Sequence, residues 1–158
     1  MHLASAQSEH CWEKTQETEA LTADDYIKEK DCVKKTLRWL CNTPLGMEIQ
    51  QRSYANAYVM EWIAGTPLFT LEIETRYLYF INEHPELLYS FIHGMAYYKL
   101  DHPEEKDRLK LYSEGYKVVA QLASQSKELS KSSVLKPLLK AARKKAIRDY
   151  TQTVLSQN

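Results

Sequence analysis

A seven-residue phrase occurs twice in this chain, 23 positions apart, and each copy is typical of the end of a helix. The first copy covers residues 39–45 (WLCNTPL) and the second covers residues 62–68 (WIAGTPL). Each places an aromatic and an aliphatic residue before Asn or Gly, which tolerate the left-handed turn that closes many helices. The proline two positions later cannot continue the helix. The repeat therefore predicts short helices joined by tight turns, and it indicates no chemistry.

The length and composition predict one helical domain. The chain has 158 residues, of which 44% are hydrophobic, so it can bury a core. It has only four glycines and five prolines, which argues against disorder and against an all-β fold. We expect an all-α domain over residues 23–155, with five to six helices packed as antiparallel hairpins and a short repeat-like stack. A polar, acidic and flexible tail is expected over residues 1–22.

Hydrophobic residues at helical spacing indicate where the helices lie. The main helices are expected over residues 24–41, 47–64, 85–100, 104–126 and 133–153, with an extended segment over 66–72 and a short helix near 77–81. The phrases EHPE (83–86) and DHPE (101–104) are typical of helix starts, because proline and acidic residues are favoured in the first turn. Asp101 and Glu104 also have capping-box spacing.

The helix over residues 85–100 is apolar nearly all round, which is typical of a central helix. Its only polar strip consists of Glu86, Ser90 and His93. We expect His93 to be solvated on this strip.

The net charge is zero, but the charges are unevenly spread. Residues 1–30 contain seven acids and three bases, whereas residues 127–150 contain eight bases and two acids. Zero net charge removes the simplest argument for a nucleic-acid or membrane partner. No window of about 18 consecutive apolar residues occurs, so no membrane span is expected.

Basic residues four apart would share one face of the expected last helix. They are Lys136, Lys140, Lys144 and Arg148. Such a face could bind nucleic acid or an anionic surface. No aromatic residues interleave on it, so a solvated charged face is the favoured interpretation and nucleic-acid binding is the alternative.

Aromatic residues give a second candidate binding surface. Tyr97 and Tyr98 could form a platform for a sugar or a peptide together with Trp62. The competing interpretation is that the tyrosines are buried with their hydroxyl groups at the rim of the core.

Three histidines occur at nine-residue intervals, at His84, His93 and His102. With Glu83 beside the first, they could form a metal or acid–base site of a small enzyme. The metal-binding motifs Cys-x-x-Cys and His-Glu-x-x-His do not occur, and neither does a nucleophile elbow or a glycine-rich phosphate loop. We therefore assign no catalytic residue and expect no metal or cofactor.

The cysteines and the first residues bear on where the protein is located. Cys32 and Cys41 would lie roughly 13.5 Å apart on one helix, which is too far for a disulfide. Cys11 could reach either, but the spacing matches no disulfide framework, and three free thiols are expected. Residues 4–6 (ASA) have the small-x-small pattern that signal peptidases cut after. The pattern predicts a longer exported precursor, or it is a chance feature of the tail.

Residues in the second half of the chain support a family resemblance: Pro85-Glu86-Leu87-Leu88, Phe91, Gly94, Tyr98, Leu100, Pro103, Lys106-Asp107-Arg108-Leu109-Lys110 and Gly115. With them, the chain resembles a family of short, exported, all-helical proteins of Gram-negative bacteria over Asp24 to Tyr150. The resemblance implies export to the periplasm or secretion, with a cytoplasmic location as the alternative. It implies no activity and no catalytic residues.

Taken together, these features predict an exported, non-enzymatic helical protein that binds a protein or an envelope component. The enzyme with a histidine site and the nucleic-acid-binding protein are the two alternatives.

Overall fold

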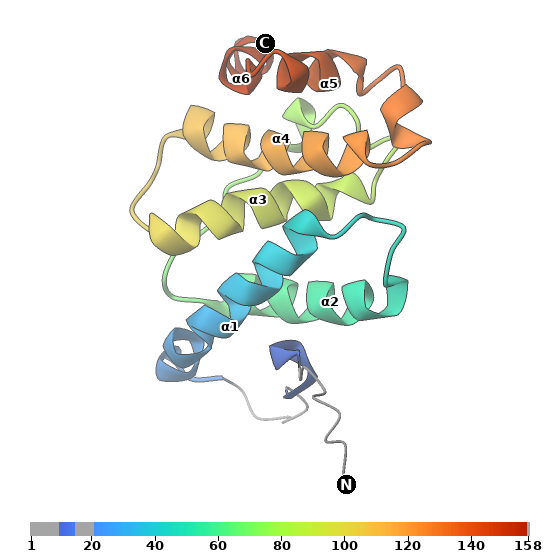
Figure 1. Ribbon diagram of the computed structural model, residues 1–158. Helices are drawn as coiled ribbons and strands as arrows, with labels where there is room; N and C mark the ends of the chain where they lie inside the picture. Colours follow the sequence, from blue (N-terminus) through green and yellow to red (C-terminus); the bar gives the residue numbers. More distant parts are fainter. Residues whose placement is uncertain (1–9, 15–20, 158) are drawn as a thin grey trace, which may run out of the picture.

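The computed structural model of the protein describes residues 10–14 and 21–157. These residues fold into α-helices and short 3-10 turns, with no strand among them (Figure 1). The six α-helices are α1 (Ala23–Asn42), α2 (Ile49–Gly65), α3 (Leu87–Asp101), α4 (Arg108–Ser124), α5 (Lys136–Arg143) and α6 (Ile147–Leu155). The 3-10 turns are η1 (Cys11–Lys14), η2 (Thr75–Tyr77) and η3 (Leu129–Lys131). The prediction of an all-α fold is confirmed.

The helices are stacked in layers from one end of the molecule to the other (Figure 1). α1 and α2 pair at one end, α3 and α4 lie in the middle, and α5 and α6 close the other end. α3 contacts both α1 and α4, and α4 contacts both α5 and α6. This stacking agrees with the predicted bundle of helix hairpins.

The buried hydrophobic residues form two clusters that meet at α3. Phe91 and Met95 belong to the cluster completed by α4, α5 and α6, whereas Ala96 and Leu100 belong to the cluster around α1 and α2. α3 is therefore the central helix that its nearly continuous apolar sequence predicts. Even so, no helix in the described part of the chain has the length and apolarity needed to cross a membrane.

Two of the three residues of the polar strip expected on α3 are buried, and only Glu86 is exposed. Ser90 and His93 are each only 2% exposed. The prediction was wrong at His93, because its imidazole ring is buried in a contact with Asn56 of α2. Helical periodicity shows which residues share a face, but not which neighbouring helix covers it.

Both copies of the repeated phrase end a helix with the same hydrogen bond. The backbone N–H of Thr43 donates to the carbonyl of Trp39, and that of Thr66 donates to the carbonyl of Trp62, with a length of 2.9 Å in each case. Both threonines have extended backbone angles. The left-handed residue predicted at these two ends is absent from both. The helices stop because a residue that precedes proline is restricted to the extended region.

The start of α4 differs from its predicted position. α4 begins at Arg108, where the side chain of Asp107 caps it by accepting a hydrogen bond from the backbone N–H of Leu109 at 3.0 Å. Asp101, predicted as the cap of this helix, is instead the last residue of α3. Its carboxylate forms an ion pair with Lys34 of α1. The DHPE phrase therefore belongs to a helix end and the loop that follows.

Two glycines allow α3 and α4 to approach each other closely. A Cβ atom at Gly94 would lie 2.5 Å from the backbone carbonyl oxygen of Glu114. A Cβ atom at Gly115 would lie 2.6 Å from the ring of Phe91. Since real Cβ atoms do not approach other atoms so closely, this helix contact requires glycine at both positions.

We expect Gly94→Ala to lower the free energy of unfolding by about 1–3 kcal/mol. The added methyl group displaces the backbone of α4, and this cost exceeds the gain in helix propensity of about 1 kcal/mol. Urea denaturation measures the effect. Gly46→Ala is the control, because no atom lies within 4 Å of its Cβ position, and it should change stability by less than about 0.5 kcal/mol. Equal stability of the two variants would contradict the close approach.

Candidate functional site

The basic C-terminal segment is broken into two helices. The sequence predicts one helix over residues 133–153, but α5 ends at Arg143 and α6 begins at Ile147. Between them, Lys145 has a φ of 55°, which lies in the left-handed region and ends the helix. The break has no proline or glycine to mark it, so the periodicity of the sequence continues across it. As a result, α5 and α6 both pack against α4.

A groove with a volume of about 740 Å³ lies between α4 and the α5–α6 segment. We call it the basic groove. Four cationic side chains line it: Lys117 from α4, Arg143 from α5, Lys145 from the break and Arg148 from α6. Among the described residues that line the groove there is no Asp or Glu. Its electrostatic character is therefore positive, and it favours an anionic ligand.

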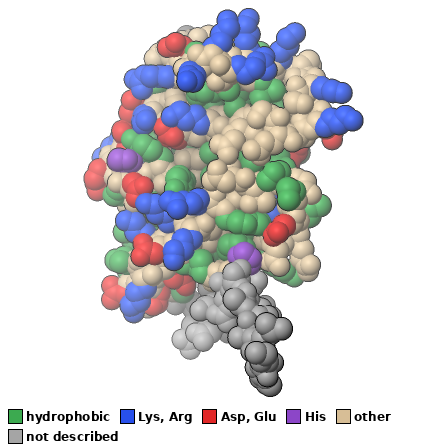
Figure 2. All heavy atoms as spheres, viewed as in Figure 1, with side chains coloured by type: hydrophobic (Ala, Val, Ile, Leu, Met, Phe, Trp, Pro, Cys, Tyr) green, Lys and Arg blue, Asp and Glu red, His purple; other side chains and the backbone are tan. Residues whose placement is uncertain are grey.

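The floor of the basic groove is apolar. It is formed by Ala120 of α4, Leu139 and Ala142 of α5, and Ile147 of α6. Figure 2 shows Lys and Arg side chains gathered over the α5–α6 end of the molecule, with hydrophobic side chains directly beneath them. An apolar floor beneath a cationic rim suits a ligand that combines an apolar part with negative charge.

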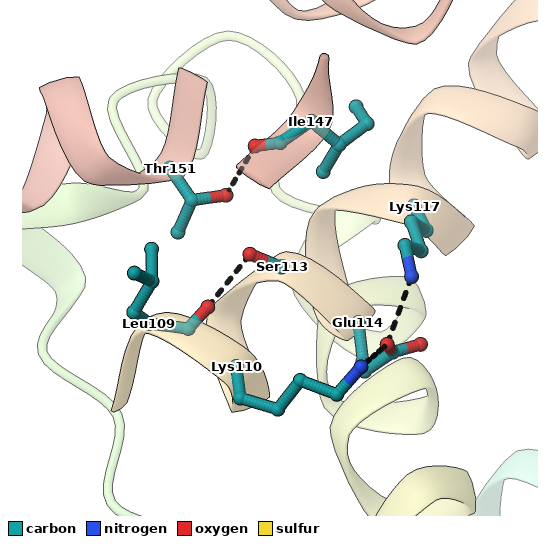
Figure 3. Close-up of polar contacts among 7 residues, drawn as sticks. All are labelled: Leu109, Lys110, Ser113, Glu114, Lys117, Ile147 and Thr151. Atoms are coloured by element: carbon teal, nitrogen blue, oxygen red, sulfur yellow. Dashed lines mark hydrogen bonds and ion pairs between the residues drawn. The ribbon is translucent and has the colours of Figure 1, made fainter. Parts of the chain in front are cut away.

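Only one of the four groove cations has a carboxylate partner in the described part of the chain. The ammonium group of Lys117 donates to Oε1 of Glu114 at 2.9 Å, and Lys110 donates to the same oxygen at 3.0 Å (Figure 3). Burial by itself raises the pKa of the Glu114 carboxyl, but the two lysines hold this pKa below its ordinary value. Glu114 thus remains ionised and satisfies Lys117.

The other three groove cations are available to a ligand. Arg143, Lys145 and Arg148 are exposed, and none of them forms an ion pair within the residues that the structure describes. Three positive charges on one rim repel one another, and an anion bound between them relieves this repulsion.

The structure separates the basic residues that the sequence places on one face. Arg148 lines the basic groove, whereas Lys140 and Lys144 are exposed and lie outside its lining. Spacing by four predicts a common face only while the helix continues, but α5 ends at Arg143 and Arg148 belongs to α6. Sequence reasoning missed Arg143 and Lys145 as groove residues. The available signal was the density of basic residues over 143–148, not their spacing.

The aromatic candidates do not form one platform. Trp62 is 1% exposed, and its indole N–H donates to the backbone carbonyl of Tyr26 at 3.1 Å. Tyr97 packs against the cluster that contains Trp62, whereas Tyr98 packs against the other cluster. Trp62 is therefore a core residue, and the two tyrosines face different parts of the molecule.

The histidines have separate partners. Nε2 of His84 lies 2.8 Å from the hydroxyl oxygen of Ser132. The ring of His102 stacks on the ring of Tyr98, with 4.4 Å between their centroids. Glu83 is exposed. No group of three or more His, Cys, Asp or Glu side chains in the described residues is arranged to hold a metal ion.

His93 belongs to a buried polar contact between α2 and α3. Its Nε2 lies 2.8 Å from Oδ1 of Asn56, and its Nδ1 has no hydrogen-bond partner within the described chain. Nearby, the guanidinium group of Arg52 donates to the carbonyls of Leu40 and Thr43 at the end of α1. Burial, and secondarily the charge of Arg52, lowers the pKa of His93 to about 3. The imidazole is therefore neutral at neutral pH.

Two of the three cysteines form a disulfide, so the prediction of three free thiols was wrong. Cys11 is bonded to Cys32, with their Cα atoms 5.8 Å apart, and Cys41 is a buried free thiol. The bond attaches η1 to α1, and η1 contacts both α1 and α2. Trp12 of η1 is buried there, with 7% of its surface exposed. The tail expected over residues 1–22 is thus joined to the domain at η1. The ASA pattern at residues 4–6 lies outside the described residues.

The basic groove is concave, and the charged side chains among its described lining residues all have the same sign. The aromatic set and the histidine set are each dispersed among separate contacts. Comparison with protein-family models, curated protein sequences and solved structures finds no match to this chain.

Proposed function

We propose that the protein is an exported, non-enzymatic binding protein that holds an acidic segment of a partner protein in the basic groove. The observation that carries this proposal is the set of three cations around an apolar floor, Arg143, Lys145 and Arg148, none of which has an ion pair among the described residues. Acidic side chains of the partner would pair with the rim, and its apolar side chains would cover the floor.

The shape and lining of the groove favour a protein segment over nucleic acid. Proteins that bind single-stranded nucleic acid stack bases on aromatic side chains, and no aromatic residue is among the described residues that line the groove. A phosphate backbone also has no apolar groups to cover Leu139 and Ile147. A peptide segment supplies both kinds of group, as a helix with acidic and apolar faces does.

Two observations support export. The Cys11–Cys32 disulfide is typical of proteins that fold in an oxidising compartment. The second is the resemblance to short exported helical proteins of Gram-negative bacteria, which implies the periplasm or the medium. We accordingly place the partner in the envelope or outside the cell.

The proposal is tested with two matched triple variants. The groove variant carries Arg143→Glu, Lys145→Glu and Arg148→Glu, and the control variant carries Lys136→Glu, Lys140→Glu and Lys144→Glu, outside the lining. Both have the same net charge and alter the same segment of the chain. The probe is a synthetic amphipathic helical peptide with Glu on one face and Leu on the other, measured by fluorescence anisotropy.

We expect the groove variant to lose at least about tenfold in affinity, because its reversed charges repel the peptide. The control variant should change by less than about threefold. Equal losses in both variants, or no binding by the wild type, would overturn the proposal. Tighter binding to single-stranded DNA than to the peptide, with a steep loss between 50 and 200 mM salt, would favour the nucleic-acid alternative.

The natural partner is then sought with the same variants. Wild-type protein with a photo-crosslinking residue at Gln121, in the groove lining, is added to the envelope and secreted fractions. A true partner is captured by the wild type and the control variant but not by the groove variant, and its crosslinked peptide is acidic. Capture that is independent of the groove charges would contradict the proposal.

A further inference from the structure

A second candidate site lies away from the basic groove, on both sides of the segment that connects α2 to η2. Two hollows, of about 360 and 340 Å³, lie beside this segment, and Thr70 belongs to the lining of both. Each is within the size range of small-molecule sites, about 300–1,000 Å³. The two hollows differ sharply in chemistry.

The first hollow contains a buried ammonium group. Lys99 of α3 is 5% exposed, and its Nζ donates to the backbone carbonyls of Pro103 at 2.9 Å and Glu105 at 2.7 Å. No carboxylate forms an ion pair with Lys99 in the described part of the chain. A buried charge without a counter-ion is costly, and two neutral carbonyls compensate it only in part.

Other charges around the first hollow largely cancel one another. Its lining contains the cations Lys99, Lys106 and Arg108 and the acids Glu72 and Glu105. Arg108 is paired with Glu74 at 2.6 Å, and Oε1 of Glu105 accepts a hydrogen bond from the backbone N–H of Asp107 at 2.9 Å. Neither carboxylate forms an ion pair with Lys99. An anion in this hollow would provide the counter-ion that Lys99 lacks.

The second hollow is mostly apolar. Its lining includes Met60 and Ile63 of α2, Phe69, Leu71 and Ile73 of the connecting segment, and Ile92 of α3. Phe69, which lines the second hollow, lies close to Lys99, which lines the first: the ammonium group is 5.8 Å from the centre of the Phe69 ring. An apolar tail could therefore continue from an anionic head at Lys99 past Thr70 into the second hollow.

We infer that these hollows form one binding site for an amphiphilic monocarboxylate with a medium-length apolar chain. The carboxylate pairs with Lys99, and the chain lies along Phe69 and Leu71. This site is independent of the basic groove, with which it shares no lining residue.

The probe for this site is octanoate, compared with acetate, which lacks the chain, and octanol, which lacks the charge. Binding to the intact protein is followed by NMR, through the methyl signals of Ile63 and Ile92. We expect octanoate to bind at least about tenfold more tightly than acetate, because burial of each methylene group is favourable. Octanol should bind more weakly than octanoate because it cannot neutralise Lys99.

Two variants locate the site. Lys99→Met removes the charge and should weaken octanoate binding at least about tenfold. Thr70→Trp places a large side chain where the two hollows meet, at an exposed position, and leaves Lys99 unchanged. It should also weaken octanoate binding at least about tenfold. Lys35→Met changes an exposed lysine of α1 and is the control for loss of charge.

The outcomes separate this site from the basic groove. Octanoate binding should persist in the triple groove variant, whatever the result with the acidic peptide. If that variant abolishes octanoate binding, or if Thr70→Trp leaves it unchanged, the inferred site is wrong. Equal affinities for octanoate and acetate would likewise overturn it. If Lys99→Met does not fold, as judged by circular dichroism, Thr70→Trp still decides the question.

Discussion

Lowering the pH from 6.5 to 4.5 is expected to reduce the free energy of unfolding by about 2 kcal/mol through His93 alone. Burial lowers the pKa of His93 to about 3 in the folded protein, from an ordinary value of 6.5. The unfolded chain therefore binds a proton below pH 6.5 that the folded protein does not bind. Stability is fully present above pH 6.5 and is lost as the pH falls towards 3. Urea denaturation at several pH values measures this loss.

His93→Gln is the matched variant for this experiment. Glutamine can keep a hydrogen bond to Asn56, and it does not titrate. Since all other histidines are shared, the difference between the two pH profiles isolates His93. Asp101 and Glu114 are among the carboxyl groups whose pKa values are lowered in the folded protein. Their protonation reduces stability mainly at pH values below their ordinary pKa values of 3.8 and 4.5. If the two profiles are parallel between pH 6.5 and 4.5, His93 is not buried as described.

Reduction of the Cys11–Cys32 disulfide is expected to lower the free energy of unfolding by about 3 kcal/mol. The bond joins residues 21 positions apart, so it restricts the unfolded chain considerably. Reduction also frees η1 and thereby weakens the packing of Trp12 on α1 and α2. The measurement is urea denaturation with and without a reductant.

The cysteine variants provide the control. Cys41→Ala retains the disulfide and should respond to the reductant as the wild type does, whereas a Cys11→Ser, Cys32→Ser double variant should not respond. Denatured protein should react with one equivalent of a thiol reagent before reduction and with three equivalents after it. Three reactive thiols in protein taken directly from its native source would argue against the disulfide, and would remove one support for export.

The elements that follow from local signals could be predicted from the sequence. The proline after each copy of the repeated phrase ends α1 and α2 through the restriction it places on Thr43 and Thr66. The sequence of α3 predicts its central position because it is apolar nearly all round. These features depend on residues within a few positions of one another, so periodicity and helix-stop rules are sufficient.

The features that depend on distant parts of the chain could not be predicted in this way. His93 is buried in a contact with Asn56 of α2, which is 37 positions away, and the partner of Cys11 depends on where η1 packs. The basic groove exists because the basic segment is broken at Lys145, which has a positive φ. Nothing in the sequence marks this break, because lysine is not a residue type that usually signals a turn. A periodic stripe of lysines is visible in the sequence, but the cations that line the groove come from three helices and from the break between two of them.

The disulfide and the basic groove lie at opposite poles of the molecule (Figure 1). η1 packs on α1 and α2, whereas the groove is formed by α4, α5 and α6 at the far side of α3. A protein tethered through its N-terminal pole would therefore display the groove outward, unobstructed by its support. For surface-based capture experiments, this makes the N-terminal pole the natural point of attachment and leaves the opposite pole open to the partner.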